Sequence, residues 1–334
     1  MVMTSGAEPS DIDLSIVIDL SPATITGKCD TDARVQAWVH QAAAVAPVRC
    51  EVVLASNQAQ PPNVHAEEGV AIRFVPVATG SHYALKNAGV NAARGAVVLC
   101  TDGDCRPGEG YVAHLVRAFQ DPAVQCAGGV SVYDGDGLLT RLNTAHSWGF
   151  VHGGQAGLDK NMILAHNVAF RRAAVGRDPF GPFLRRVGGD RYLTETLRRQ
   201  GHRIRLVDGM RIRHEDITYS FRGTLERHLR EHLLPVQYGT PRQHFSLPFT
   251  LVSLVLRPLL RIYRAFQARR PLGLRPWHLP VVLALNSAYA VFDAGAVFVV
   301  LLVPRLRRQW IDFLIGPIAA PVSGRLGEMH SSPS

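Results

Sequence analysis

The chain has 334 residues, 47% of them hydrophobic, which is enough for one large domain or two modest ones with a sizeable core. Its formal net charge of +9 favours anionic partners, such as phosphates or an anionic membrane face. The five cysteines are odd in number and lack paired C-x-x-C spacing, which argues against a disulfide framework or a zinc site and suits a reducing compartment.

The first hundred residues alternate short apolar runs with helical patterns. The predicted elements are strands at 14–20, 50–56, 70–77 and 96–100, and helices at 33–45 and 83–95. This order predicts an α/β fold with a mostly parallel, Rossmann-like sheet that has helices on both faces. Ligands of such sheets bind beyond the carboxyl ends of the strands. No G-x-G-x-x-G follows the first strand, which argues against a dehydrogenase.

The fourth strand runs directly into two aspartates, Asp102 and Asp104, separated by one glycine. Two carboxylates held this close repel each other unless a cation lies beside them. A hard divalent ion such as Mn²⁺ or Mg²⁺ prefers oxygen ligands and keeps open positions for substrate phosphates. The alternative is a simple polar turn, because Asp and Gly are common turn residues.

The elements after Pro107 are less regular. A helix is predicted at 111–120 and a strand at 124–133, followed by a long loop or lid over 134–160. Within this loop Trp148 could stack on a sugar ring or simply anchor the loop to the core. Ordered structure resumes at 167–175. A helix at 190–201, stopped by Gly201, then leads into a strand beginning at His202.

Residues 245–315 have the composition of membrane-associated hydrophobic helices. The apolar segment 279–303 is 25 residues long, enough to cross a bilayer, although Asp293 opposes insertion. A hairpin lying on the membrane surface and a buried pair of core helices are the alternatives. Nine arginines lie between residues 257 and 308 and would favour anionic headgroups. They alternate with aliphatic runs, so nucleic acid is not expected as a partner.

Three segments, in this order, resemble the family 2 glycosyltransferases. They are ALKNAGVNAARGAVVLCTDGD (84–104), HNVAFRRAAV (166–175) and VGGDRYLTETLRRQGHRIRLVDGMRIRHE (187–215). The resemblance covers roughly residues 12 to 215. It implies a GT-A nucleotide-diphospho-sugar transferase fold over residues 12–220, a nucleotide-sugar donor and, in most relatives, inversion of the anomeric centre.

The resemblance also implies roles for individual residues. Asp102 and Asp104 would bind the metal and the donor diphosphate, and Asp190 would be the catalytic base, a role compatible with its capping the following helix. His214 matches a histidine that completes the metal site in some relatives, although it could equally be a structural residue at a strand end.

Two further residues fall where the family's helix approaches the nucleotide. Lys86 could meet a phosphate as a point charge, or could be a solvated surface lysine. Asn87 follows it directly.

The chain departs from the family pattern at three places. The first strand ends in Asp19-Leu20-Ser21-Pro22 instead of Pro-x-x-Asn. Ser56 and Asn57 stand where the family commonly has an aspartate that reads uracil, so these two residues are the candidates for contact with the base. Gly189 replaces the glutamate of the family's Glu-Asp pair.

The sequence thus predicts a metal-dependent, inverting glycosyltransferase at the cytoplasmic face of the cell membrane. Its acceptor would be a hydroxyl on a lipid-linked or cell-envelope glycan. The predicted organisation is a disordered stretch at 1–11 without a secretory signal, the catalytic domain at 12–220, a linker helix at 221–244, the hydrophobic helices and a disordered tail at 316–334. A nucleotidyltransferase on the same fold and a degenerate, non-catalytic nucleotide-sugar-binding membrane protein are the alternatives.

Overall fold

The computed structural model describes residues 12–21, 30–58, 60–78, 81–135, 137–152, 163–181, 189–214 and 247–302, with residues 305 and 309. The predictions for the N-terminal stretch 1–11, the linker helix 221–244 and the tail 316–334 concern residues outside these ranges. They therefore stay predictions.

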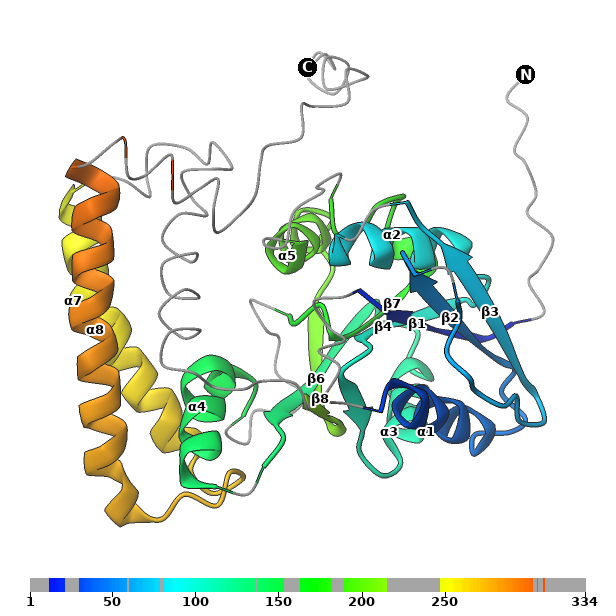
Figure 1. Cartoon of the computed structure of the whole chain (residues 1–334), viewed down its shortest axis with the longest axis horizontal. Helices are drawn as coiled ribbons and strands as arrows, with labels where there is room; N and C mark the ends of the chain where they lie inside the picture. The colour runs from blue at the N-terminus through cyan, green and yellow to red at the C-terminus, as the bar shows by residue number, and fades with distance from the viewer. Residues whose placement is uncertain are drawn as a thin grey trace.

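The described chain forms a single mixed β-sheet with helices on both of its faces, as Figure 1 shows. The strands are β1 (Leu14–Asp19), β2 (Cys50–Ser56), β3 (Val70–Pro76), β4 (Val97–Asp102), β5 (Cys105–Pro107), β6 (Cys126–Tyr133), β7 (Asn167–Arg171) and β8 (Ile204–His214). The α-helices are α1 (Thr31–Ala43), α2 (His82–Ala92), α3 (Tyr111–Phe119), α4 (Leu138–Trp148), α5 (Gly189–Arg199), α7 (Leu247–Ala268) and α8 (Leu279–Leu302). Short 3₁₀ turns are η1 (Gly149–Val151), η2 (Arg172–Ala174) and η4 (Pro276–His278).

The strand order is β3-β2-β1-β4-β7-β6-β8-β5. The first four strands pair in parallel, as predicted, and β6 also runs parallel to β8. The other pairings are antiparallel, because β7 runs against both β4 and β6, and β5 runs against β8. The α/β architecture with flanking helices is confirmed and fits the GT-A fold, while the second half of the sheet is mixed rather than parallel.

Alternation along the strands fills a core on each face of the sheet. In β1, Ile16 and Ile18 join the cluster that packs against α1 and α3, whereas Val17 points to the opposite cluster. That opposite cluster includes Tyr83 of α2 and Leu193 of α5. The arrangement leaves the carboxyl ends of β1 and β4 side by side, since Asp19 is the register partner of Asp102.

The predicted loop over 134–160 contains a helix, α4, which the polar and glycine-rich composition did not indicate. Leu142 and Ala145 of α4 pack against Ala265 and Ala268 of α7, more than a hundred residues further along the chain. This helix is therefore stabilised by a tertiary contact that local sequence does not reveal.

The helix predicted over 83–95 instead ends at Ala92.

The C-terminal region predicted to be hydrophobic forms the antiparallel pair α7 and α8, which lies beside α4 in Figure 1. Both helices contribute to a small cluster with α4, through Ala265 and Val282, and Leu272 of the turn between them joins it. Within the part of the chain that the structure describes, no helix is both long enough and apolar enough to span a membrane. The spanning segment predicted over 279–303 is therefore not supported.

Near the opposite ends of the strands, Glu51 of β2 is a fully buried carboxylate. Its Oε1 accepts hydrogen bonds from Ser15 Oγ and from the backbone N–H of Arg94, both at 2.6 Å. Its Oε2 accepts from Arg94 Nε at 3.2 Å and from Arg73 Nη1 at 3.3 Å. Burial by itself raises the pKa of Glu51, but these hydrogen bonds outweigh it and hold the pKa below the usual 4.5.

We predict that Glu51→Gln lowers the free energy of unfolding by about 2 kcal/mol at pH 7, since several charge-assisted hydrogen bonds are lost. The pKa of Glu51 is depressed in the folded state, so its contribution is present above about pH 4.5 and is lost as the pH falls through the folded-state pKa. Urea unfolding of both proteins between pH 3 and pH 7, roughly, should therefore show the difference shrinking with acid.

Glu195→Gln is the matched control. Glu195 forms i,i+4 ion pairs with Arg191 and Arg199 on the surface of α5, and such exposed pairs contribute less than about 1 kcal/mol. An equal effect of the two substitutions would contradict the role assigned to the Glu51 network.

Candidate active site

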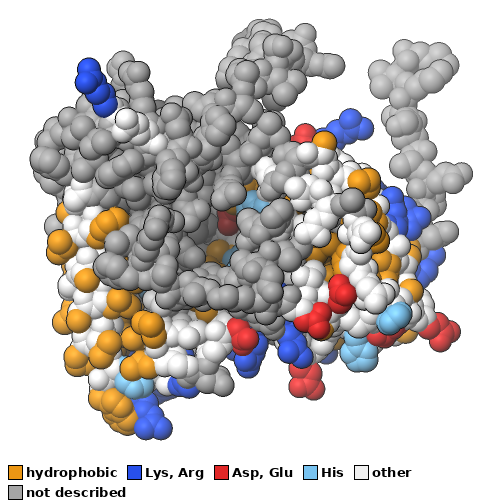
Figure 2. All heavy atoms as spheres, in the orientation of Figure 1, with side chains coloured by type: hydrophobic (Ala, Val, Ile, Leu, Met, Phe, Trp, Pro, Cys, Tyr) orange, Lys and Arg blue, Asp and Glu red, His pale blue; other side chains and the backbone are white. Residues whose placement is uncertain are grey.

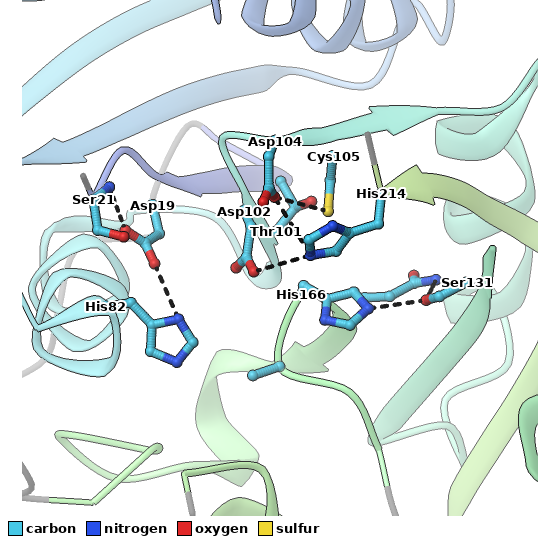
Figure 3. A network of polar contacts seen from close by, with 12 residues as sticks. Asp19, Ser21, His82, Thr101, Asp102, Asp104, Cys105, Ser131, His166 and His214 are labelled. Atoms are coloured by element: carbon cyan, nitrogen blue, oxygen red, sulfur yellow. Dashed lines mark hydrogen bonds and ion pairs between the residues drawn. The ribbon is translucent and has the colours of Figure 1, made fainter. Parts of the chain in front are cut away.

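Asp102 and Asp104 lie at the carboxyl end of β4 and are both buried, with 5% and 2% of their surface exposed. The side chain of His214, the last residue of β8, points toward both of them, as Figure 3 shows. Its Nε2 lies 3.6 Å from Asp104 Oδ1 and 4.0 Å from Asp102 Oδ2. The pairing of Cys105 with His214 in the β5–β8 ladder brings this histidine to the aspartates from 110 residues further along the chain.

These three side chains suit a divalent cation. Carboxylate oxygens of Asp102 and Asp104, an imidazole nitrogen of His214 and the sulfur of Cys105 all lie within 4.8 Å of one another. Burial raises the pKa of the Cys105 thiol well above its usual range, so the thiol stays protonated and is a poor ligand. The two carboxylates suit Mn²⁺ or Mg²⁺, and an imidazole beside them is an unusual but acceptable ligand of Mn²⁺. The predicted metal residues are thus brought together.

Lys86 is fully buried between two carboxylates at the strand ends. Its ammonium group forms an ion pair with Asp102 Oδ1, donates to Thr101 O at 3.0 Å and lies 3.5 Å from Asp19 Oδ2. Sequence reasoning offered either a phosphate contact or a solvated surface lysine. The side chain has no exposed surface, so it is not solvated, and its contacts are with the two carboxylates and the Thr101 carbonyl.

Burial and the neighbouring charges together lower the pKa of Asp102 and raise the pKa of Asp19. Burial would raise the pKa of Asp102, but the Lys86 ammonium outweighs it, with smaller contributions from His82, His166 and His214, so the pKa lies well below its usual range. For Asp19, burial prevails over the attraction of Lys86 and raises the pKa to about 7. At neutral pH Asp102 is therefore fully ionised, whereas Asp19 is ionised only in part.

Asp190 occupies the first turn of α5 and is partly exposed. Its Oδ1 accepts a hydrogen bond from the Tyr83 hydroxyl, and its Oδ2 accepts from the backbone N–H of Ala165 at 3.3 Å. Burial raises the pKa of Asp190, although these two hydrogen bonds oppose the shift. A carboxylate with a raised pKa that remains reachable from solvent is suited to accept a proton.

The residues predicted to contact the nucleotide lie in different surroundings. The Asn87 amide accepts from Phe180 N at 3.0 Å and donates to Gly181 O at 2.8 Å, so it holds that segment against α2. Ser56 is buried at the end of β2, where its hydroxyl accepts from Gln58 N. Asn57 is exposed beside it. Nucleotide contacts by these residues stay predictions.

Trp148 packs inside the molecule next to the metal-ligand cluster. It is 7% exposed, its ring stacks on Tyr133 with centroids 3.8 Å apart, and it lies 5.6 Å from the ring of His214. These contacts favour the anchoring role over stacking on a sugar. They also place apolar surface around His214, which reduces solvent access to the ligands.

Four residues of the site were not singled out as functional from the sequence: Asp19, His82, Tyr83 and His166. His82 Nδ1 lies 3.5 Å from Asp19 Oδ2, and His166 Nε2 lies 3.2 Å from Ser131 Oγ (Figure 3). Of these four, only Asp19 could have been found from the sequence. It is a charged residue at the end of a buried strand parallel to β4, so it is expected at the same edge of the sheet as Asp102.

Residues 56–178 match the family model described as glycosyl transferase family 2. The match covers less than half of the chain, and over this segment it supports the resemblance to the family 2 glycosyltransferases. The matched segment includes Lys86, Asp102 and Asp104, whereas Asp190 and His214 lie beyond it. The expected enzyme class, a glycosyltransferase, is confirmed.

No curated protein is detectably similar to this glycosyltransferase. Among solved structures, the mannosyltransferase PcManGT from Pyrobaculum calidifontis, in complex with GDP-Man and Mn²⁺, aligns at 14% identity and a TM-score of 0.42 over 92% of this chain and 87% of that chain. TarS of S. aureus aligns at 10% identity and a TM-score of 0.40, over 86% of this chain and 54% of that chain.

We predict that Lys86→Met destabilises the protein by about 3–5 kcal/mol, because it leaves Asp19 and Asp102 buried without their cation. Denaturant unfolding measures this loss directly. Adding Asp19→Asn to the variant should restore part of the stability, since one of the two buried carboxylates is then removed. A cost below about 1 kcal/mol for the single variant would show that Lys86 is not needed to hold the carboxylates.

Proposed function

We propose that this glycosyltransferase moves a sugar from a nucleoside diphosphate to a hydroxyl acceptor, with inversion and with the help of a divalent cation. The observation that carries the proposal is the convergence of Asp102, Asp104 and His214 at the strand ends of the sheet. The Asp190 carboxylate supplies a second, separate acidic group on α5.

The cluster of Asp102, Asp104 and His214 would bind the donor. Asp102, Asp104 and His214 would hold Mn²⁺ or Mg²⁺, which when bound neutralises the diphosphate as its bond to carbon breaks. Asp102 keeps one oxygen, Oδ1, on Lys86, while Oδ2 is the atom that faces His214. Lys86 therefore fixes the orientation of this carboxylate before any ligand binds.

The acceptor side rests on Asp190. Single displacement at an anomeric carbon requires a base that removes the proton of the attacking hydroxyl as the leaving group departs. Asp190 is ionised above its raised pKa, is partly exposed and is held at both oxygens. Direct attack of the hydroxyl on the face opposite the leaving group inverts the configuration, which is the outcome we propose.

The two alternatives drawn from the sequence are weaker. A nucleotidyltransferase does not follow from the family match. A non-catalytic binding protein does not require a second carboxylate, Asp190, that is held at both oxygens and partly exposed. We therefore propose catalysis by this chain, with the identities of the sugar and the nucleotide left to experiment.

The proposal predicts release of nucleoside diphosphate from one member of a panel of nucleotide-sugars, with Mn²⁺ or Mg²⁺ present. EDTA should abolish the release, and Asp104→Asn should abolish it while weakening Mn²⁺ binding measured by calorimetry, because one ligand is lost. Asp190→Asn should bind the metal and the donor normally but turn over at least about 100-fold more slowly.

Asp134→Asn serves as the matched control. Asp134 directly follows β6 and is exposed, and its side chain forms a surface ion pair with Arg213. Its contact with His214 is made by the backbone N–H, which the substitution keeps, so turnover should be unchanged. Full activity of Asp190→Asn would refute the assignment of the base, and activity that persists after metal removal would refute the metal requirement.

We also propose that the enzyme works at an anionic membrane surface through α7 and α8, where it would meet a lipid-linked or cell-envelope acceptor. An exposed apolar stripe along α7 contains Leu256, Leu259, Leu260, Tyr263 and Phe266, spaced as one helical face. In Figure 2, hydrophobic side chains gather over these helices, with basic ones at the end of the pair. The cytoplasmic side stays a prediction.

The turn between the two helices has the chemistry of an interfacial anchor. Trp277 is 64% exposed, and the guanidinium of Arg275 lies 5.1 Å from its ring centroid. Arg269 covers the ring of Phe266 at 3.8 Å. Aromatic rings next to cations suit the headgroup layer, where each arginine contributes about 1 kcal/mol with anionic lipid.

We predict that the protein sediments with vesicles of phosphatidylcholine and phosphatidylglycerol but not with phosphatidylcholine alone, and that salt weakens the binding. Leu259→Asp in the stripe should reduce binding at least about tenfold. The control is Leu139→Asp, because Leu139 is equally exposed, 58%, but belongs to α4. Equal binding of both variants and of the wild type would refute the surface.

A further inference from the structure

The hydroxyl of Tyr83 connects helix α2 to the proposed base. Tyr83 lies in the first turn of α2 and is 4% exposed, and its hydroxyl donates to Asp190 Oδ1. The ring is held in place by Phe180, whose ring stacks on it at a centroid distance of 5.8 Å, and by His82 at 4.0 Å. The position of the phenol is thus fixed independently of Asp190.

The residue before the base makes room for this ring. Gly189 begins α5 and is buried, and a Cβ atom at this position would lie 2.5 Å from two carbon atoms of the Tyr83 ring. Contacts this short do not occur between real side chains, so any other residue would force Tyr83 or α5 to move. The Tyr83 ring can occupy its position only because residue 189 has no side chain.

We propose that Tyr83 is a positioning residue for Asp190, and that Gly189 is required so that the Tyr83 hydroxyl can reach it. This inference rests on the proposed function, in which Asp190 is the base. The chain lacks the glutamate that precedes the aspartate in the pattern its sequence resembles, and here a phenol takes the place beside the carboxylate.

The hydrogen bond fixes which carboxylate oxygens are engaged. Tyr83 holds Oδ1 and the Ala165 N–H holds Oδ2, so the carboxylate cannot rotate without losing one of the two. Each oxygen of a carboxylate can accept a second hydrogen bond, which leaves capacity for a hydroxyl acceptor. A base held in one orientation avoids the entropy loss of finding the reactive geometry.

The same hydrogen bond acts on the protonation of the base. The groups that act on the Asp190 charge are Tyr83 from α2, the Ala165 N–H before β7, the backbone N–H of Asp190 itself and Asp102 from β4. Burial raises the pKa of Asp190, Tyr83 and Ala165 oppose that shift, and the charge of Asp102 adds to it. Loss of the phenol hydroxyl should therefore raise this pKa further.

The test is the pH dependence of nucleoside diphosphate release for Tyr83→Phe, with the donor that the panel identifies. Because the base must be deprotonated, the acidic limb of kcat should move upward by about one pH unit, equivalent to a tenfold loss of rate below the limb. The KM for the donor should stay unchanged, because Tyr83 does not contact the metal ligands.

Gly189→Ala gives a second route to the same result. Its methyl group should displace the intact phenol and shift the acidic limb in the same direction, and the double variant should shift it no further than the larger single effect. Tyr111→Phe is the matched control, since it also loses a buried phenol hydrogen bond, at 2.6 Å to Asn167 Oδ1. It should lower stability without moving the limb.

Each outcome decides one of the two claims. If Asp190→Asn loses turnover but Tyr83→Phe and Gly189→Ala keep the wild-type limb, the proposal for Tyr83 is overturned and the proposed function stands. A uniform loss of rate at all pH values in Tyr83→Phe would show a merely structural role and would also overturn it. If Asp190→Asn remains active, or if no nucleotide-sugar is turned over, the proposed function fails first.

Discussion

The site depends on one buried interaction, the ion pair of Lys86 with the carboxylates at the ends of β1 and β4. Parallel pairing in register brings Asp19 and Asp102 to the same edge of the sheet, where their charges repel. A lysine with no exposed surface compensates them from α2. Without this cation, the two buried carboxylates at the strand ends would oppose the folding of the sheet itself.

Helix α2 is therefore more than a crossover between β3 and β4. Tyr83, Lys86 and Asn87 occupy one short stretch of it and reach three different parts of the site: the proposed base, the carboxylates of the proposed metal site and the segment at 180–181. Since a helix is rigid over such a length, the proposed donor and acceptor sides are held relative to each other by a single element. This explains how residues far apart in the sequence keep a fixed mutual geometry.

Much of this could be predicted from the sequence. Apolar runs with short spacings identify β1 to β4, and Asp102 with Asp104 at the end of such a run marks the site, because parallel strands carry ligands there. The family resemblance also named His214 as a candidate metal ligand. These features are local or follow a known motif.

The rest depends on contacts that local sequence does not encode. Lys86 looks like a surface or phosphate-binding residue until the fold places it between two carboxylates, and Asn87 looks available until residues 180–181 occupy its amide. Helix α4 appears only because α7 covers it, and the reversed direction of β7 has no signal in its own residues. Secondary-structure propensity and hydrophobic periodicity do not predict packing partners that lie a hundred residues away in the sequence.

The contact between Tyr83 and Gly189 also restricts how this chain can change. A side chain introduced at 189 alone collides with the ring, while removal of the ring alone leaves Oδ1 of Asp190 without its donor. Each single substitution is thus disfavoured, although the two together describe another workable arrangement. Positions 83 and 189 are therefore coupled, and the tolerance of each to substitution depends on the residue at the other.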